Sequence, residues 1–225
     1  MKKYALIVAA GSGSRMETAI PKQFLLLQGK PVLMHTLEAF YNYDPEIQII
    51  ALLAPEQKDY WHDLCQKHNF RINHLVVDGG ATRFHSVKNG LAHVDDEALV
   101  AVHDGVRPIV DRELLEVLFL EAEKEKAVYP AVPVVDTLRR WMGNGKNKTM
   151  DRSKFYLVQT PQVFSSRLLT RAYQTEYSEQ YTDDVSVVEA RRLCTPVMVA
   201  GKRENIKITT PVDLIIAEAI LKQRQ

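Results

Sequence analysis

The chain has 225 residues, 46% of them hydrophobic, and a formal net charge of +1 at pH 7. A chain of this length can bury a full hydrophobic core, and we expect one domain over residues 1–225. The near-neutral charge gives no reason to expect nucleic acid or an anionic membrane as a partner. The sequence predicts a cytoplasmic protein with reduced thiols. It has two cysteines but no C-x-x-C motif, and it shows no signal peptide and no apolar run of transmembrane length.

Strand-like and helix-like segments alternate through the first half of the chain. Short apolar runs typical of buried strands lie at residues 4–10, 47–53, 73–77, 99–103 and 127–132. The segments between them predict helices at residues 32–41, 55–68, 83–92 and 111–124. This alternation predicts an α/β fold with a mostly parallel sheet, helices on both faces, and ligands bound at the carboxyl ends of the strands.

Residues 134–157 interrupt this alternation. Two weakly alternating segments flank a glycine- and asparagine-rich turn at residues 143–147, which predicts a β-hairpin. Such a hairpin has little apolar content of its own and needs something to pack against. Two interpretations stay open: a surface hairpin on its own subunit, or an arm that reaches into a second subunit. Beyond it, helices are predicted at residues 165–175 and 182–193, and a last helix follows a cap at Thr210.

The first predicted strand leads into a glycine-rich loop that contains Gly11, Gly13 and Arg15, with Lys22 further along. Such a loop can turn its N–H groups toward an anion, and the two cations suit a polyphosphate. Met16 stands where a dinucleotide-binding fingerprint needs glycine, and no Gly-Lys-Ser/Thr sequence completes a Walker A loop. The string G-x-G-x-R-M-x5-K instead resembles the signature loop of sugar-nucleotide and polyol-phosphate nucleotidyltransferases.

A second group of polar residues follows the predicted strand at residues 99–103. Asp104 is expected to point into the cleft there, where a single carboxylate beside a polyphosphate is typical of Mg²⁺ coordination. Arg107 faces the same side and could hold a second phosphate. His103 is interpreted as structural, because no serine or cysteine is placed to act as its nucleophile.

Two further groups supply candidate binding residues. A loop with Gly80, followed by Ser86 on the next helix, can present main-chain groups to the edge of a base. Thr137, Arg152 and Thr160 suit a phosphorylated polyol, since an arginine binds the phosphate and hydroxyls bind the alcohol groups.

The last part of the chain adds Lys207 and Thr182. Lys207 lies between two isoleucines on a short predicted strand and projects either to solvent or to the edge of the cleft. Thr182 is interpreted first as the cap of the helix at residues 182–193, with Asp183 and Asp184 in its first turn.

Taken in order, these strings resemble the 2-C-methyl-D-erythritol 4-phosphate cytidylyltransferase family over essentially the whole chain. The matching strings are A-A-G-x-G-x-R-M, P-K-Q, V-D-G-G, V-H-D-x-x-R-P, D-T, D-R, T-P-Q and N-I-K-x-T. The resemblance implies a Rossmann-like domain with a hairpin arm, at about residues 134–157, that clasps a partner subunit in a homodimer. It also implies transfer of CMP from CTP to methylerythritol phosphate, a polyol phosphate, with release of pyrophosphate and with Mg²⁺ as the divalent cation.

The resemblance further implies a role for each candidate residue. Those assigned to binding CTP are Ala9, Ala10, Gly11, Gly13, Gly80 and Ser86. Those that would stabilise the triphosphate and its transition state are Arg15, Lys22 and Lys207, with Asp104 at the Mg²⁺. Those around the methylerythritol phosphate are Arg107, Thr137, Arg152, Thr160 and Thr182.

Three other functions compete with this interpretation. Ribitol-5-phosphate cytidylyltransferases form a sister family with the same loops; the A-A-G of the first loop favours the methylerythritol enzymes, whereas Val106 leans toward the ribitol enzymes. A nicotinamide-dependent dehydrogenase disagrees with Met16. A non-catalytic nucleotide-binding regulator would have no need for the aspartate, arginine and lysine that follow the first loop.

Overall fold

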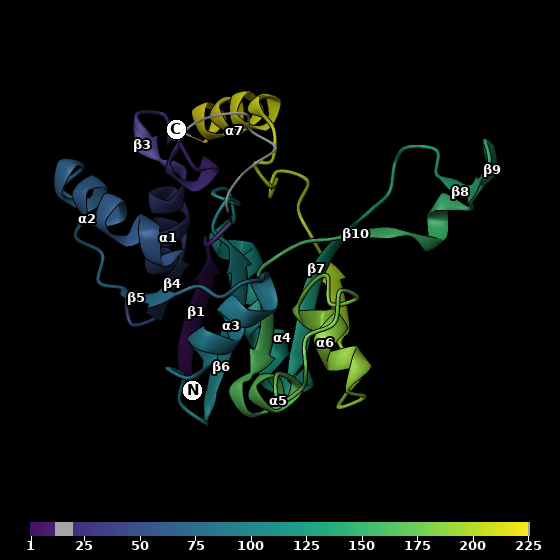
Figure 1. Ribbon diagram of the computed structural model, residues 1–225, viewed down its shortest axis with the longest axis horizontal. Helices are drawn as coiled ribbons and strands as arrows, with labels where there is room; N and C mark the ends of the chain where they lie inside the picture. The colour runs from purple at the N-terminus through teal and green to yellow at the C-terminus, as the bar shows by residue number, and fades with distance from the viewer. Residues whose placement is uncertain (12–19, 225) are drawn as a thin grey trace.

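The computed structural model describes residues 1–11 and 20–224. Its main sheet has eight strands: β1 (Lys2–Val8), β4 (Gln48–Leu53), β5 (Leu75–Asp78), β6 (Ala98–Asp104), β7 (Ala127–Pro133), β10 (Tyr156–Val158), β11 (Gln162–Ser165) and β12 (Val197–Ala200). Their order is β10-β7-β11-β6-β1-β4-β5, with β12 paired to β7 (Figure 1).

The part of the sheet built from the first strands is parallel. β1 pairs with β4 and β6, β4 pairs with β5, and each pair runs parallel. β12 also runs parallel to β7. By contrast, β11 lies antiparallel between β6 and β7, and β10 is antiparallel to β7. The predicted α/β fold with a mostly parallel core is therefore confirmed, with an antiparallel insertion.

Sequence and structure disagree on three short segments. The hydrophobic pattern of the sequence predicts neither β11 nor β12. In β11, the polar Gln162 and Ser165 flank only two apolar residues. The strand predicted around Lys207 is wrong: Ile208 donates its N–H to the carbonyl oxygen of Val106 (2.9 Å), without a ladder of paired strands. This segment is therefore held against the loop after β6, not against a strand.

Helices cover both faces of the sheet, as predicted. On one face lie α1 (Val32–Tyr43), α2 (Lys58–Lys67) and α4 (Arg112–Glu125). On the other lie α3 (Arg83–Leu91), α5 (Ser166–Ala172) and α6 (Asp184–Ala190). Successive side chains of a strand point to opposite faces, so in β1 Ala5 and Ile7 join the first core, whereas Tyr4 and Leu6 join the second.

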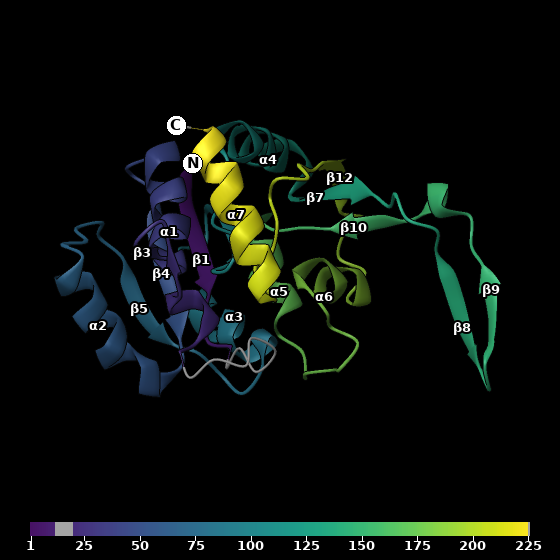
Figure 2. The same ribbon diagram turned by 90° about the horizontal axis from the view of Figure 1, so that it is seen from above.

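The last helix, α7 (Pro211–Gln223), lies near the carboxyl ends of the parallel strands (Figure 2). It packs on a third, smaller hydrophobic cluster through Ala217. Thr210 and Asp213 form a capping box at its start, with Pro211 in the first turn, which confirms the predicted cap. Short elements complete this end: 3-10 helices at Lys22–Phe24 and Pro55–Gln57, and a small hairpin of β2 (Leu26–Leu27) and β3 (Lys30–Pro31).

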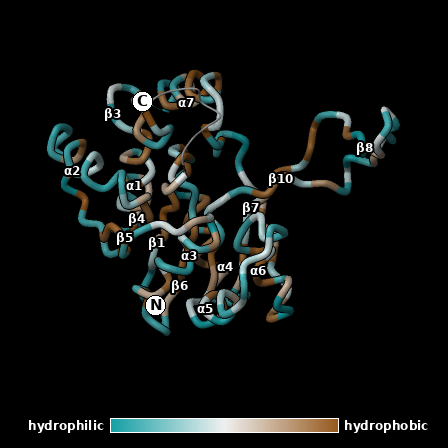
Figure 3. The backbone as a smooth tube through the Cα atoms, viewed as in Figure 1, coloured by the Kyte–Doolittle hydropathy of each residue, from teal (hydrophilic) through white to brown (hydrophobic). Residues whose placement is uncertain are grey.

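The predicted hairpin exists and extends far from the body of the molecule (Figures 1 and 2). It consists of β8 (Arg139–Gly143) and β9 (Lys146–Thr149), followed by a 3-10 turn at Arg152–Lys154. Its apolar side chains are open to solvent, with Trp141 67% exposed. Figure 3 shows that β10, at its base, is hydrophobic as well, and Leu157 there is 57% exposed. We call residues 134–158 the arm.

Within the described residues, no helix combines the length and the apolar character needed to cross a bilayer. The cytoplasmic location stays a prediction of the sequence.

Candidate active site

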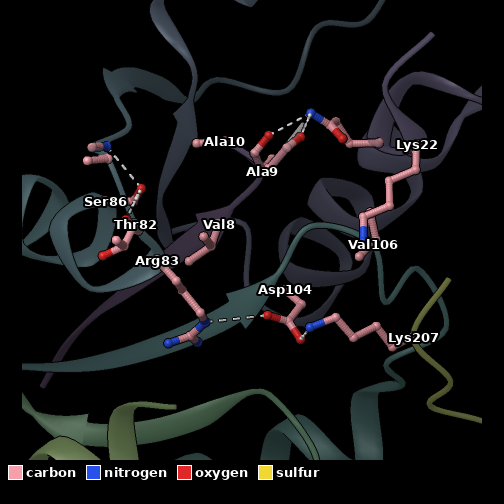
Figure 4. Close-up of a pocket in the computed structure, with 14 residues that line it drawn as sticks. Val8, Ala9, Ala10, Lys22, Thr82, Arg83, Ser86, Asp104, Val106 and Lys207 are labelled. Atoms are coloured by element: carbon pink, nitrogen blue, oxygen red, sulfur yellow. Dashed lines mark hydrogen bonds and ion pairs between the residues drawn. The ribbon is translucent and has the colours of Figure 1, made fainter. Parts of the chain in front are cut away.

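Two cavities open at the carboxyl ends of the parallel strands, where the fold predicts ligands to bind. The first cavity, of about 440 Å³, lies between the loop after β1 and the loop before α3. The second cavity, of about 260 Å³, lies toward β11 and the start of α6. Arg83, Asp104 and Lys207 line both, so the two cavities meet at these side chains (Figure 4).

The first cavity brings together most of the residues predicted to bind the nucleotide. Its lining includes Ala9, Ala10, Gly11, Lys22, Gly80, Ser86, Asp104 and Lys207. Gly13 and Arg15 lie outside the described residues. Figure 4 shows the ammonium groups of Lys22 and Lys207 extending into the same space from opposite elements.

A buried glutamine from the P-K-Q string, for which the sequence predicted no role, holds the start of the loop after β1. The side-chain amide of Gln23 donates to the carbonyl oxygens of Ala9 (2.8 Å) and Gly11 (3.2 Å) and to Oε1 of Gln57 (2.9 Å). Only 1% of Gln23 is exposed. The signal available in the sequence was its place directly after Lys22.

The loop before α3 is equally constrained. The N–H of Gly80 donates to Oγ of Ser86 (3.0 Å), and this hydroxyl in turn donates to the carbonyl oxygen of Thr82 (3.0 Å). A Cβ on Gly80 would come within 2.3 Å of Cβ of His85. Ser86 therefore shapes the wall of the cavity through the main chain of the loop, and only glycine fits at residue 80.

Asp104, the last residue of β6, is surrounded by three cations. Nζ of Lys207 lies 2.9 Å from Oδ2, Nε of Arg107 lies 3.3 Å from Oδ2, and Nε of Arg83 lies 3.6 Å from Oδ1. Burial alone would raise the pKa of the Asp104 carboxyl, but the charges of Arg83, Lys207 and Arg107 outweigh it and hold that pKa well below its ordinary value. The carboxylate is thus ionised at every physiological pH.

His103 and Thr160 form a buried network behind Asp104. The hydroxyl of Thr160 accepts from the N–H of Asp104 (3.1 Å), which leaves its proton for Nδ1 of His103 (3.1 Å). Nε2 of His103 then donates to the carbonyl oxygen of Arg107 (3.0 Å). Burial lowers the pKa of His103 to about 4, so the ring is neutral. These bonds agree with the structural role predicted for His103 and give Thr160 a role in positioning Asp104.

This network makes stability depend on pH. Between pH 4 and 6.5 the unfolded chain protonates His103 while the folded protein keeps it neutral, so the unfolded state binds more protons. Stability therefore falls as pH drops through this range, by about 2 kcal/mol at pH 5 for this group alone. Urea unfolding at pH 7 and pH 5 should show a drop that is smaller by this amount in His103→Gln than in the wild type. The same drop in both proteins would contradict the role of His103; His93→Gln, on the surface, is the control.

The second cavity contains three of the five residues predicted to bind the polyol phosphate. Arg107, Thr160 and Thr182 line it. Thr137 and Arg152 do not: both lie in the arm, where the guanidinium of Arg152 donates to the carbonyl oxygen of Val135. The predicted cap of α6 is shifted by one residue, because Asp183, not Thr182, accepts the N–H of Ser186 (2.9 Å). Thr182 is thereby left on the wall of the cavity.

Two glutamines and Arg83 complete this region, and the sequence assigned none of them. Gln162 accepts the N–H groups of Asp184 (3.1 Å) and Val185 (3.0 Å) at the start of α6. Gln159 donates to the carbonyl oxygen of Lys202 (2.8 Å) and so holds the segment that leads to Lys207. The signal for both glutamines was their place on either side of the Thr-Pro pair.

The residues of the first cavity could hold Mg²⁺ only together with a bound polyphosphate, whose oxygens would complete the set of metal ligands. No cluster of three or more histidine, cysteine or acidic side chains with the geometry of a metal site occurs in the described parts of the chain. Among the described residues, Asp104 is the one carboxylate that lines the first cavity, and Mg²⁺ is commonly held by one or two carboxylates together with substrate phosphates. Asp104 stays ionised, and the cavity that it lines is also lined by two lysines that could bind phosphate, which suits this arrangement.

Three features of this site are typical of nucleotidyltransferases, which join a nucleotide to a phosphorylated acceptor. They are a glycine-containing strand-to-helix loop, an ionised aspartate surrounded by a lysine and two arginines, and a second cavity on the far side of that aspartate. The chain belongs to the 2-C-methyl-D-erythritol 4-phosphate cytidylyltransferase family (IspD), whose model matches residues 4–223.

Known members of the family match along their whole length. The 2-C-methyl-D-erythritol 4-phosphate cytidylyltransferase of Azobacteroides pseudotrichonymphae is 57% identical over 98% of this chain and 99% of its own. The one from Bacteroides fragilis is 54% identical over 98% and 100%. Among solved structures, that of 2-C-methyl-D-erythritol 4-phosphate cytidylyltransferase from Thermus thermophilus superposes with a TM-score of 0.80 at 32% identity, over 99% of this chain and 100% of that one.

Proposed function

We propose that the two cavities carry out the reaction of the family: transfer of CMP from CTP to 2-C-methyl-D-erythritol 4-phosphate, giving 4-diphosphocytidyl-2-C-methyl-D-erythritol and pyrophosphate in isoprenoid precursor synthesis. CTP occupies the first cavity and the acceptor phosphate the second. The observation that carries this assignment is the wall the cavities share, Arg83, Asp104 and Lys207, because the two reacting phosphates must meet there.

The reaction needs no general base. The acceptor phosphate is already an oxyanion at neutral pH, so it attacks the α-phosphorus of CTP directly, in line with the departing pyrophosphate. A new P–O bond forms as the bond to pyrophosphate breaks, and the electron pair leaves on pyrophosphate. His103 is neutral, buried and used in hydrogen bonds, so it takes no part in proton transfer.

Catalysis then consists of positioning and charge neutralisation. Lys22 enters the first cavity from the 3-10 helix at Lys22–Phe24, and Lys207 enters at the boundary between the cavities. Both ammonium groups are placed to stabilise the charge that grows on the phosphates, together with Arg15 of the glycine-rich loop. Mg²⁺ held by Asp104 and the phosphates would supply further neutralisation of negative charge.

We further propose that the domain over residues 1–225 works as a homodimer, in which the arm places Thr137 and Arg152 at the partner's second cavity. Three observations support this. The arm projects away from its own body, its apolar residues are exposed, and neither Thr137 nor Arg152 is among the described residues that line the two cavities of its own chain (Figure 1). An isolated two-stranded ribbon is marginally stable by itself.

Subunit complementation tests the arm. Arg152→Ala and Lys207→Ala are each expected to be nearly inactive alone. If arms are exchanged, a mixed dimer has one intact site, made of Lys207 from one chain and Arg152 from the other. Co-expression should then restore about a quarter of the wild-type activity, since half of randomly formed dimers are mixed and each has one of two sites intact. No recovery would mean that each arm serves its own chain.

The activity itself is tested by pyrophosphate release with CTP and Mg²⁺, with methylerythritol phosphate and ribitol phosphate offered in parallel. We expect turnover with methylerythritol phosphate. Turnover with ribitol phosphate alone would overturn the acceptor assignment while leaving the CTP site and the chemistry in place. Protection against thermal unfolding by CTP but not by NAD would exclude a dehydrogenase.

A further inference from the structure

Arg83, the first residue of α3, is the one arginine among the described residues that lines both cavities. Figure 4 shows its guanidinium between the loop before α3 and Asp104. It follows directly after Thr82, the cap of α3, which lines the first cavity. The guanidinium therefore stands at the boundary between the two cavities.

Two carboxylates hold this guanidinium from different sides. Nη1 and Nη2 donate to Oδ1 (2.9 Å) and Oδ2 (2.6 Å) of Asp184, while Nε lies 3.6 Å from Oδ1 of Asp104. Asp184 is fully buried and also accepts the hydroxyl of Tyr173 (2.6 Å). A bidentate pair of this kind fixes both position and orientation. Lys207, in contrast, reaches Asp104 with one ammonium group and is 38% exposed, so it is freer to turn toward a phosphate.

The pair also joins two segments that lie 101 residues apart in sequence. Asp184 begins α6, and Thr182 and Asp183, immediately before it, line the second cavity. Arg83 begins α3, and Gly80, Ala81 and Thr82, shortly before it, line the first. The Arg83–Asp184 pair thus connects the wall of one cavity with the wall of the other.

We propose that Arg83 is a positioning residue for the transfer reaction: by bridging Asp184 and Asp104, it fixes the acceptor cavity relative to the nucleotide cavity. This inference rests on the proposed function, which assigns one substrate to each cavity. Arg83 contributes alignment of the acceptor phosphate with the α-phosphorus, and it acts through Asp184 and the start of α6. The geometry of the guanidinium fork, beyond its charge, is what the role requires.

The test uses Arg83→Lys, Asp184→Asn and the double variant, with Arg167→Lys as the control. Lysine keeps the positive charge but cannot bind two carboxylates in a fork. Arg167 pairs with Glu97 (2.8 Å) on the surface, so its replacement repeats the chemistry of the change away from the cavities. Wild-type turnover of CTP with methylerythritol phosphate, measured first, tests the proposed function separately. For every variant, KM and kcat are measured for each substrate, CTP binding is measured by calorimetry, and the melting temperature is recorded.

We expect Arg83→Lys and Asp184→Asn each to raise KM for the acceptor about tenfold and to lower kcat, with CTP affinity within threefold of the wild type. The double variant should lose no more activity than the more impaired of the two single variants, because both changes break the same bridge. Equal losses for both substrates, additive losses, or a lower melting temperature with unchanged KM values would overturn the proposal and leave Arg83 a structural residue. If Asp184→Asn does not fold, the kinetics of Arg83→Lys alone test the proposal. This variant is expected to fold, because lysine still pairs the buried Asp184 carboxylate with a cation.

Discussion

Replacing Lys207 or Lys22 by alanine is expected to raise the activation free energy by roughly 2–4 kcal/mol, which lowers kcat about 30- to 1,000-fold. Each ammonium group points into the first cavity, and Lys207 stands where the two cavities meet. Such groups stabilise charge that appears only as the bond to pyrophosphate breaks, so the loss should fall on kcat more than on KM. Single-turnover measurements with saturating CTP and acceptor would separate this step from product release.

A surface lysine serves as the control for both variants. Lys124 pairs with Glu121 (3.1 Å) on the exposed side of α4, and Lys124→Ala should retain wild-type kcat. Turnover near the wild-type value in Lys207→Ala or Lys22→Ala would remove that lysine from the transition-state assignment.

The second large effect is expected from Asp104→Asn, which keeps the shape of the side chain and removes its charge. Activity should fall at least a hundredfold, on the scale of losing a preorganised electrostatic contact, and the Mg²⁺ concentration for half-maximal activity should rise. Stability should also fall by about 1–3 kcal/mol, because three neighbouring cations lose their shared anion. Magnesium titrations of activity and urea unfolding measure the two effects.

The pH dependence of this second effect has a definite sign. The folded-state pKa of Asp104 is depressed, so its contribution to stability is present above the pKa of the unfolded chain and is lost only in acid. The stability difference between wild type and Asp104→Asn should therefore be constant from pH 6 to pH 8. Asp95→Asn, at an exposed pair with Lys2, is the matched control. An unchanged magnesium requirement in Asp104→Asn would contradict the assignment of this carboxylate to the metal.

The sequence predicts the site best where one segment carries its own signal. The loop after β1 and the loop with Gly80 are each local patterns of glycine and apolar residues. The structure places Ala9–Gly11, the described part of the first loop, and Gly80 of the second at the first cavity. Asp104 could be found because it ends a buried strand. In each case the chemistry and the secondary structure are encoded within a few residues.

Residues whose role depends on a distant partner escape such reasoning. Gln162 is a polar residue in a central strand, and its burial makes sense only beside the N–H groups at the start of α6. Asp184 is, in sequence, an acid at the start of a helix, which is a favourable place in any helix. That it also binds Arg83 follows from the packing of α3 against this region, which no local pattern shows. Thr137 and Arg152 are a further case, since their surroundings depend on whether a second chain is present.

The place of β11 has a consequence for synthesis on the ribosome. β7 is the next strand of the main sheet after β6 along the chain, yet the two do not pair, because β11 lies between them. The ribosome makes β11 only after the whole arm has been translated. Until then, β6 presents an open, hydrophobic edge, and such edges invite pairing with another chain. A message truncated before β10 would yield a polypeptide in which β7 has none of its partner strands, because it pairs with β10, β11 and β12. We expect such fragments to aggregate or be degraded.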